Sequence, residues 1–385
     1  MSRYYFDYAA ATPIDEDVVR AMESARTTFA NPASLYAEGR AARELLDAAR
    51  KRIAAVLGAQ SREIVFTSGA TESDNLAILG ALTAAGEPQA RVITAPTEHA
   101  AVRACTQVAR ASGYDVQEVE VAESGMINVE TVRKRVTDTT VLLTLAIATS
   151  EIGTFQPIGE IGQLVREVRV DRQKRGIATP IILHTDASAA LGYLPLPVDR
   201  LGVDLMTLSS SKTYGPVGIG ALYVRRGTPL TPLIIGGRQE ASLRSGTPAV
   251  ELAVGFATAT EKAEAMRKQE VTRLQVLHDE LWMGLKAISG IQLNGHKKKH
   301  LAGMLNVSFA GFDGENLVLA LDAAGFAVAT GAACAESSDE PSHVLLALGR
   351  TRAEAQGSLR ISLGRTTTSE EVQALISAIR KIVVQ

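Results

Sequence analysis

The sequence predicts an α/β protein with a mostly parallel central sheet, helices on both of its faces, and a smaller second α/β domain. Short apolar runs alternate with amphipathic segments from residue 63 to residue 225, which is typical of repeated βαβ units. A long helical stretch then leads into a shorter mixture of strands and helices. The 385 residues have room for both domains, and we place the large one at residues 15–257 and the small one at 1–14 and 258–385.

The composition is that of an ordinary globular protein. Apolar residues make up 46% and charged residues 21%, and the net charge of −2 gives no reason to expect nucleic acid or an anionic membrane as a partner. We expect no secretory leader, and no apolar run is long enough to span a membrane. The two cysteines, Cys105 and Cys334, are too few for a disulfide framework in a chain of this size. These features predict a cytoplasmic protein.

Two helices are expected ahead of the alternating region. Asp15 can cap the first, which runs to about Phe29, and the second extends from about Leu35 to Leu57 with its apolar residues on one stripe. Gly58 is typical of a helix end. The segment Asn31–Ser34 is predicted to be a turn, because Asn tolerates unusual backbone angles and the residue before proline avoids the helical region.

The large domain is expected to contain seven strands, each a short apolar run of the kind that is buried on both faces of a parallel sheet. These runs lie at residues 63–67, 91–95, 115–121, 141–148, 180–183, 204–208 and 219–225. The helices between them are expected at residues 68–85 (with an opening turn at 68–73), 98–112, 129–136 and 158–173.

The small domain follows a helical region at about residues 248–288. Because this region is longer than an ordinary globular helix, we expect a break within it. Beyond it we expect strands near 304–309 and 358–363, helices near 315–324, 343–348 and 369–384, and a polar loop at 329–342.

Asp186 and Lys212 follow two neighbouring expected strands. Parallel strands would bring both residues to the same carboxyl edge of the sheet, where open α/β sheets bind ligands. A carboxylate and a lysine in one crevice suit pyridoxal phosphate (PLP), since the lysine can bind its aldehyde and the carboxylate can keep its ring nitrogen protonated. Taken alone, such a pair is more often a salt bridge than a cofactor site.

Other residues could bind the phosphate and the ring of such a cofactor. The turn at 68–73 opens a helix, and its backbone N–H groups, together with Ser209 and Ser211, suit an anion, although small polar residues also cap helices that bind nothing. His99 could stack on the ring and relay protons, or form only local hydrogen bonds at the start of its helix.

The cysteines and two arginines are the remaining candidates. Cys105 lies among apolar residues and is expected to be a buried structural thiol. Cys334, in the polar loop, is either a reactive nucleophile or a bystander. Arg244 and Arg360 each need a carboxylate, which could come from the protein or from a substrate.

Several segments match, in order and across nearly the whole chain, the motifs of a known family. They are Asp7–Pro13, Asn31–Ser34, Glu63–Asn75, Thr97–His99, Glu151–Gly153, His184–Ala187, Lys212–Pro216, Arg244–Thr247 and the loop around Cys334. On these motifs the chain resembles the cysteine desulfurases of the NifS/IscS type, which are PLP-dependent class V aminotransferases. The resemblance implies fold type I and a homodimer.

The resemblance also implies roles for the matching residues. Lys212 would hold PLP covalently, Asp186 would bind the pyridine nitrogen, and His99 would stack on the ring. The other implied contacts are Ala70, Thr71 and Ser209 at the phosphate, Thr247 at the partner subunit's cofactor, and Asn31 and Arg360 at the substrate carboxylate.

The implied activity converts L-cysteine to L-alanine while Cys334 takes the sulfur as a persulfide. An acceptor protein, either a scaffold or a sulfur carrier, would then receive it, and the pathway it feeds is left open. Cys334 could also hold a transient iron–sulfur cluster, and no resident metal is expected. Selenocysteine lysis or a β-elimination is an alternative within the same family.

The chain departs from the family around the cofactor. Thr149 and Ser150 replace two asparagines, Ala189 replaces a glutamine, and Ser211 replaces the histidine before the lysine. The hydroxyl groups of Thr149 and Ser211 could still donate hydrogen bonds to the cofactor, whereas Ala189 cannot. These departures support a second hypothesis, a binding or sulfur-relay subunit without robust PLP chemistry.

Overall fold

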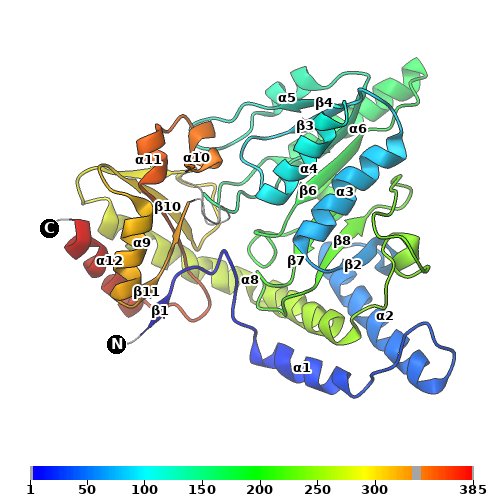
Figure 1. The fold of residues 1–385 in the computed structure, drawn as a ribbon, viewed down its shortest axis with the longest axis horizontal. Helices are drawn as coiled ribbons and strands as arrows, with labels where there is room; N and C mark the ends of the chain where they lie inside the picture. The colour runs from blue at the N-terminus through cyan, green and yellow to red at the C-terminus, as the bar shows by residue number, and fades with distance from the viewer. Residues whose placement is uncertain (1–2, 332–339, 384–385) are drawn as a thin grey trace.

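The computed structural model describes residues 3–331 and 340–383, in which a large α/β domain and a smaller domain are joined by one long helix (Figure 1). Cys334 lies outside the described residues, and so does most of the loop expected at 329–342. No helix in the described ranges has both the length and the apolar character needed to cross a membrane.

The large domain is built on one seven-stranded sheet. Its strands, in spatial order, are β2 (Ile64–Thr67), β8 (Gly220–Val224), β7 (Leu205–Ser209), β6 (Ile182–Asp186), β5 (Thr140–Thr144), β3 (Arg91–Thr94) and β4 (Asp115–Glu118). Every neighbouring pair is parallel except those that involve β8, which runs antiparallel to β2 and β7. The prediction of a mostly parallel, seven-stranded sheet is therefore confirmed.

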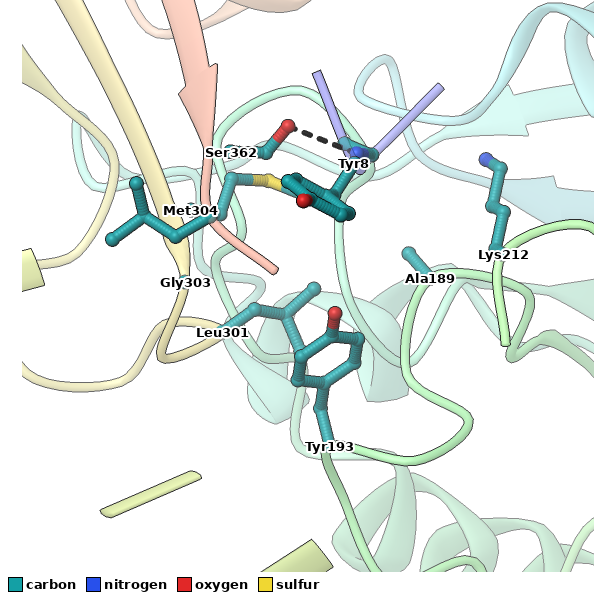
Figure 2. A pocket seen from close by; sticks show the side chains of 10 residues that line it. Tyr8, Ala189, Tyr193, Lys212, Leu301, Gly303, Met304 and Ser362 are labelled. Atoms are coloured by element: carbon teal, nitrogen blue, oxygen red, sulfur yellow. Dashed lines mark hydrogen bonds between the residues drawn. The ribbon is translucent and has the colours of Figure 1, made fainter. Parts of the chain in front are cut away.

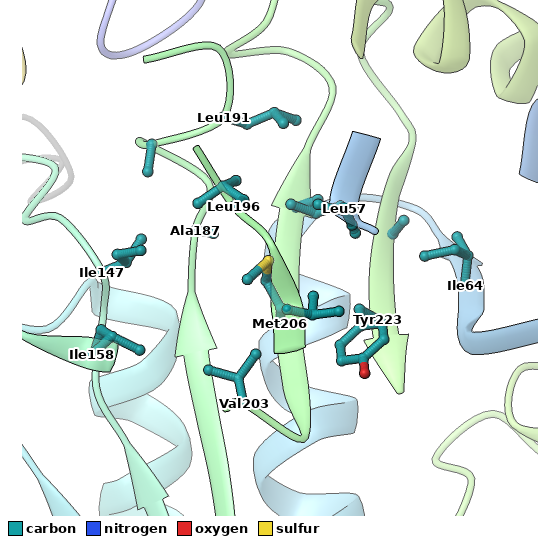
Figure 3. Close-up of a cluster of buried hydrophobic side chains, with 14 of the residues drawn as sticks. Leu57, Ile64, Ile147, Ile158, Ala187, Leu191, Leu196, Val203, Met206 and Tyr223 are labelled. Atoms are coloured by element: carbon teal, nitrogen blue, oxygen red, sulfur yellow. The ribbon is translucent and has the colours of Figure 1, made fainter. Parts of the chain in front are cut away.

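Helices cover both faces of this sheet. They are α2 (Ala37–Leu57), α3 (Ala70–Ala85), α4 (Ala100–Ala111), α5 (Val129–Arg135), α6 (Ile158–Arg175) and α7 (Val198–Leu201), with α1 (Glu16–Arg26) beside them. One face packs on α2 and α6 through buried residues such as Ile64, Ile158 and Met206 (Figure 3). The other face packs on α3 and α4, so successive residues of each strand contribute to different cores.

The small domain contains a four-stranded antiparallel sheet in the order β12 (Ala329–Thr330), β13 (Ser358–Ser362), β10 (Met304–Phe309) and β9 (Ile291–Asn294). Its helices are α9 (Gly314–Ala323), α10 (His343–Ala347), α11 (Arg352–Gln356) and α12 (Ser369–Val383). The N-terminal strand β1 (Tyr4–Tyr5) pairs in parallel with β11 (Phe326–Ala327), which attaches the start of the chain to this domain.

Helix α8 (Val250–Leu285) runs without interruption for 36 residues, so the predicted break in this region is wrong. The helix is stabilised at both ends by different cores. Phe256 is buried with the large domain, whereas Leu277 and Leu281 are buried with the small one. Packing against both cores, rather than helix propensity alone, therefore stabilises a helix of this length.

Candidate active site

The sheet brings the expected site residues to one edge. Strands β6 and β7 are parallel neighbours, with Asp186 the last residue of β6 and Lys212 three residues after the end of β7. Because β2 and β7 run in the same direction, the turn that opens α3 also starts at this edge. His99, after β3, caps α4 at the same edge.

Lys212 faces a pocket between the two domains (Figure 2). Ala189 approaches this pocket from the large domain, Met304 and Ser362 from the small domain, and Tyr8 from the N-terminal segment. The N-terminal segment is fixed here because the Ala9 N–H donates to Ser362 Oγ at 2.9 Å. The pocket thus includes residues from both domains, which is where a substrate can be enclosed.

Asp186 is held in place by a backbone donor. The backbone N–H of Ser188 donates to Asp186 Oδ1 at 2.8 Å, and the side chain is almost completely buried. A carboxylate fixed in this way can pair with the protonated nitrogen of an aromatic ring.

The N-terminus of α3 is suited to a phosphate. Gly69 precedes the helix and, among the described residues, no side chain caps it, so the N–H groups of Ala70 and Thr71 are available to an anion. The hydroxyl groups of Ser209 and Ser211 lie 3.2 Å apart beside Lys212. Together these donors form an anion-binding cradle.

His99 connects several charged groups of the site. Its Nδ1 accepts a hydrogen bond from Ala101 N at 3.2 Å, which is the local capping role considered above. Burial lowers the pKa of His99 below its ordinary value, the Asp186 charge opposes this shift, and Lys212 and Arg360 add to it. These three charges therefore lie close enough to act on one imidazole.

Arg360 comes from the small domain, in β13. One guanidinium nitrogen, Nη2, lies 2.9 Å from Asp7 Oδ1, and Nη1 donates to the Ser150 carbonyl at 3.4 Å. Its Nε is buried and has no hydrogen-bond partner among the described residues. Arg360 therefore has a protein carboxylate as a partner and keeps one buried donor that a bound ligand could satisfy.

Four other residues considered from the sequence lie apart from this pocket. Asn31 is in the connection between α1 and α2, where it lines a separate hollow with Arg238 and Glu240. Thr247 is exposed after the short 3₁₀ turn Glu240–Ser242, and the nearby Arg244 bonds Glu72 at 3.0 Å. Cys105 is buried, and burial raises its thiol pKa to about 12, as a structural thiol requires.

One departure from the family pattern, Ala189, lines the pocket together with Lys212. Another, Thr149, is buried after β5. Ser211 shares its hydroxyl contact with Ser209, and its carbonyl accepts from Thr12 N at 2.9 Å. The serine therefore retains a donor at the phosphate end, whereas the Ala189 side chain has none.

These groups fit PLP. The uncapped helix N-terminus and two hydroxyls match a phosphate, the Asp186 carboxylate matches a ring nitrogen, and Lys212 lines the adjoining pocket. Arg360, from β13 of the small domain, adds a buried Nε donor without a partner among the described residues, which an amino-acid carboxylate could satisfy.

Sequence reasoning missed several buried polar residues around this site. Glu98 accepts from Ala146 N at 3.0 Å, and burial raises its pKa to about 8. Burial likewise raises the pKa of Glu151, which accepts from Ser342 Oγ, to about 8. Asp74 and His184 are fully buried beneath the sheet edge. The available indication for Asp74 was an acid just before the apolar part of α3.

A family model described as "Aminotransferase class-V" matches residues 4–375. The chain belongs to the class-V aminotransferase family. It is 41% identical over 380 residues to the cysteine desulfurase IscS of Methanosarcina thermophila, which covers 98% of this chain and 91% of that relative. This match confirms the predicted place of the chain among the NifS/IscS-type members of the family.

Solved structures agree with this assignment. A NifS-like protein superposes with a TM-score of 0.90 at 33% identity and covers 99% of both chains. A structure described as SspA in complex with cysteine gives a TM-score of 0.80 at 35% identity, covering 94% of this chain and 99% of that one. The predicted fold type I is therefore confirmed for this family member.

Proposed function

We propose that this chain is a PLP-dependent cysteine desulfurase that converts L-cysteine to L-alanine and passes the sulfur to an acceptor protein through a persulfide on Cys334. The observation that carries the proposal is the joint placement of Lys212 and Asp186 at one sheet edge, beside the uncapped N-terminus of α3. The IscS relatives and the cysteine-bound SspA support the choice of substrate.

Different residues of the chain bind different parts of the cofactor and the substrate. Bound PLP would supply an electron-accepting ring that stabilises charge at the substrate Cα. Ala70, Thr71, Ser209 and Ser211 bind the phosphate, Asp186 holds the proton on the ring nitrogen, and His99 stacks on the ring. Lys212 Nζ anchors the cofactor and can take the proton from the substrate Cα, while Arg360 orients the substrate carboxylate.

Transfer of the substrate sulfur to Cys334 needs no external oxidant. The Cys334 thiolate attacks the substrate sulfur, so an S–S bond forms while the substrate Cβ–S bond breaks and its electron pair stays on carbon. That carbon gains a proton and leaves as alanine, and Cys334 carries the persulfide. A cysteine thiol has a pKa of about 8.5, so a nearby cation would favour the thiolate.

Purified protein supplied with PLP and L-cysteine tests this proposal. We expect alanine in equal amount to sulfide under reducing conditions, and loss of both in Cys334→Ala while the visible cofactor band stays. Lys212→Ala should lose the band as well. Cys105→Ala is the matched control, since a buried thiol of high pKa takes no part. Full turnover by Cys334→Ala would disprove its role.

A binding or sulfur-relay subunit is the second candidate, favoured by Ala189 at the pocket. Its side chain cannot donate to the cofactor, and neither catalysis nor tight PLP binding is needed for relay. A protein that stays colourless after addition of PLP, yet accepts a persulfide from a desulfurase, would support this function over the first.

We further propose that the protein is a cytoplasmic homodimer. Several large apolar side chains are exposed near the hollow that contains Asn31, including Phe29 (89% exposed), Leu35 (88%) and Ile235 (86%). Such a patch favours burial against another protein surface. A second copy would cover it and bring Asn31 and Thr247, which lie apart from the Lys212 pocket, toward the site of the other subunit.

A further inference from the structure

Asp74 is an acidic residue with an unusual environment. It lies in the second turn of α3, its side chain has no exposed surface, and neither carboxylate oxygen makes a close, well-aligned hydrogen bond within the described part of the chain, where the Thr207 hydroxyl is the donor that acts on it. An ionised carboxylate with so little support is very unfavourable in such a place. None of the roles proposed for cofactor or substrate binding involves Asp74.

Polar side chains of the central sheet lie next to Asp74 and hold one another in place. His184 Nε2 lies 3.7 Å from Asp74 Oδ1 and 3.1 Å from Thr207 Oγ1, and His184 Nδ1 lies 2.8 Å from Thr144 Oγ1. The two threonines lie on the strands that flank β6 and hold the imidazole in one orientation. His184 and Asp186 are two residues apart on β6, so both project toward the face that α3 covers.

Two carboxylates therefore share one poorly solvated region, and they have unequal support. Asp186 accepts from the backbone N–H of Ser188, whereas within the described residues the donor that acts on Asp74 is the Thr207 hydroxyl, which also contacts His184 Nε2 at 3.1 Å. Like charges in such a region cannot both be ionised at neutral pH, and the less supported group keeps its proton. We propose that Asp74 is a positioning residue that carries a proton at neutral pH and thereby leaves the negative charge under the cofactor ring to Asp186.

The ionisation of the surrounding groups agrees with this arrangement. Burial raises the pKa of Asp74 well above its usual range, and the Asp186 charge adds to the shift. Burial lowers the pKa of His184 to about 4, so its imidazole is neutral. The titratable groups that face Asp74 from the elements packed around it are His184, Asp186, Glu98, Cys105 and Lys212.

Infrared spectroscopy of the apoprotein tests the protonation directly. At pH 6 the wild type should show a protonated-carboxyl band that is lost in Asp74→Asn, which keeps the shape of the side chain. Glu98→Gln is the matched control, because it removes a different protonated carboxyl and should leave the Asp74 band in place. Persistence of that band in Asp74→Asn would overturn the proposal.

A second readout tests the positioning role, which rests on the proposed function. In protein reconstituted with PLP, the pH titration of the visible band should have an alkaline inflection in the wild type that Asp74→Asn lacks. Identical titrations would overturn the role. Failure to form any visible band would instead count against the proposed function, and the infrared result would still stand.

A third measurement covers the case in which Asp74→Asn does not fold. Wild-type apoprotein labelled with ¹³C at the aspartate carboxyls should retain one protonated carboxyl signal at pH 7 by NMR. If every aspartate signal reports an ionised carboxylate at that pH, the proposal is wrong.

Discussion

Glu98 and Glu151 are buried carboxyl groups that keep their protons in the folded protein near neutral pH. Within the described residues the Glu98 carboxyl accepts from Ala146 N and the Glu151 carboxyl from Ser342 Oγ, and burial raises the pKa of both to about 8. Unfolding returns each group to its ordinary value of 4.5, so ionisation is coupled to stability.

The sign of this coupling follows from the proton count. Between pH 4.5 and about 8 the folded state binds more protons than the unfolded state, so stability falls as pH rises. Each group contributes at most about 1.4 kcal/mol per pH unit. Glu98→Gln should remove the contribution of Glu98 and so reduce the pH dependence of the free energy of unfolding measured in urea. An unchanged slope would show that Glu98 is ionised in the folded protein.

Arg360 provides a second residue-scale prediction. Arg360→Lys keeps the charge but loses the planar set of donors, including the buried Nε. One charge-assisted hydrogen bond is worth about 1.5–3 kcal/mol, so the KM for L-cysteine should rise about ten- to hundredfold. We expect kcat and the visible cofactor band to change little. A fall in kcat as large as the rise in KM would contradict substrate binding by Arg360. A change in the cofactor band alone would contradict it as well.

The sequence could predict Asp186 and Lys212 because Asp186 ends one buried strand and Lys212 lies three residues after the end of the next. It could not predict that Asp74 and His184 lie close together, since their proximity depends on how α3 lies across β6. The carboxylate that contacts Arg360 was unknown for the same reason, because Asp7 reaches it only when the N-terminal segment lies against the small domain.

At the scale of elements, the contact between β8 and the turn before α3 fixes the anion-binding cradle. A Cβ added at Gly220 would lie 2.7 Å from the Gly69 carbonyl carbon and 2.8 Å from Leu208 O, both backbone atoms. The strand therefore needs glycine where it meets the turn. No side chain can be inserted without moving the start of α3.

Gly220→Ala should therefore weaken PLP binding by moving the phosphate donors. Loss of one charge-assisted hydrogen bond corresponds to about ten- to hundredfold in affinity, measured by titrating the apoprotein with PLP. Gly159→Ala is the matched control, since its nearest contact is 3.8 Å away and alanine favours a helix. Equal affinities for wild type and Gly220→Ala would count against this cradle.

Element prediction succeeded for segments with an apolar pattern of their own and missed the two-residue strands. The helix α6 and strand β10 follow clear apolar patterns, whereas β1, β11 and β12 have two residues each and form only through their partners. Strand β6 extends to Asp186, beyond the predicted end at residue 183, because two threonine hydroxyls satisfy His184 within the sheet.

At the scale of the whole molecule, the exposed apolar patch predicts self-association. Phe29→Asp combined with Leu35→Asp should convert a dimer to a monomer in analytical ultracentrifugation, because charges there cannot be buried against a second copy. Val170→Asp on α6, at a residue 52% exposed, is the matched control and should remain dimeric. A monomeric wild type would refute the homodimer.

Helix α8 has a further consequence for how the molecule melts. Because Phe256 belongs to one core and Leu281 to the other, neither core can lose its packing without disturbing a helix that the other core shares. Calorimetry should therefore record one cooperative transition for two domains. Lys268→Pro, at an exposed position between the two contacts, should interrupt the helix and divide the melt into two separate transitions.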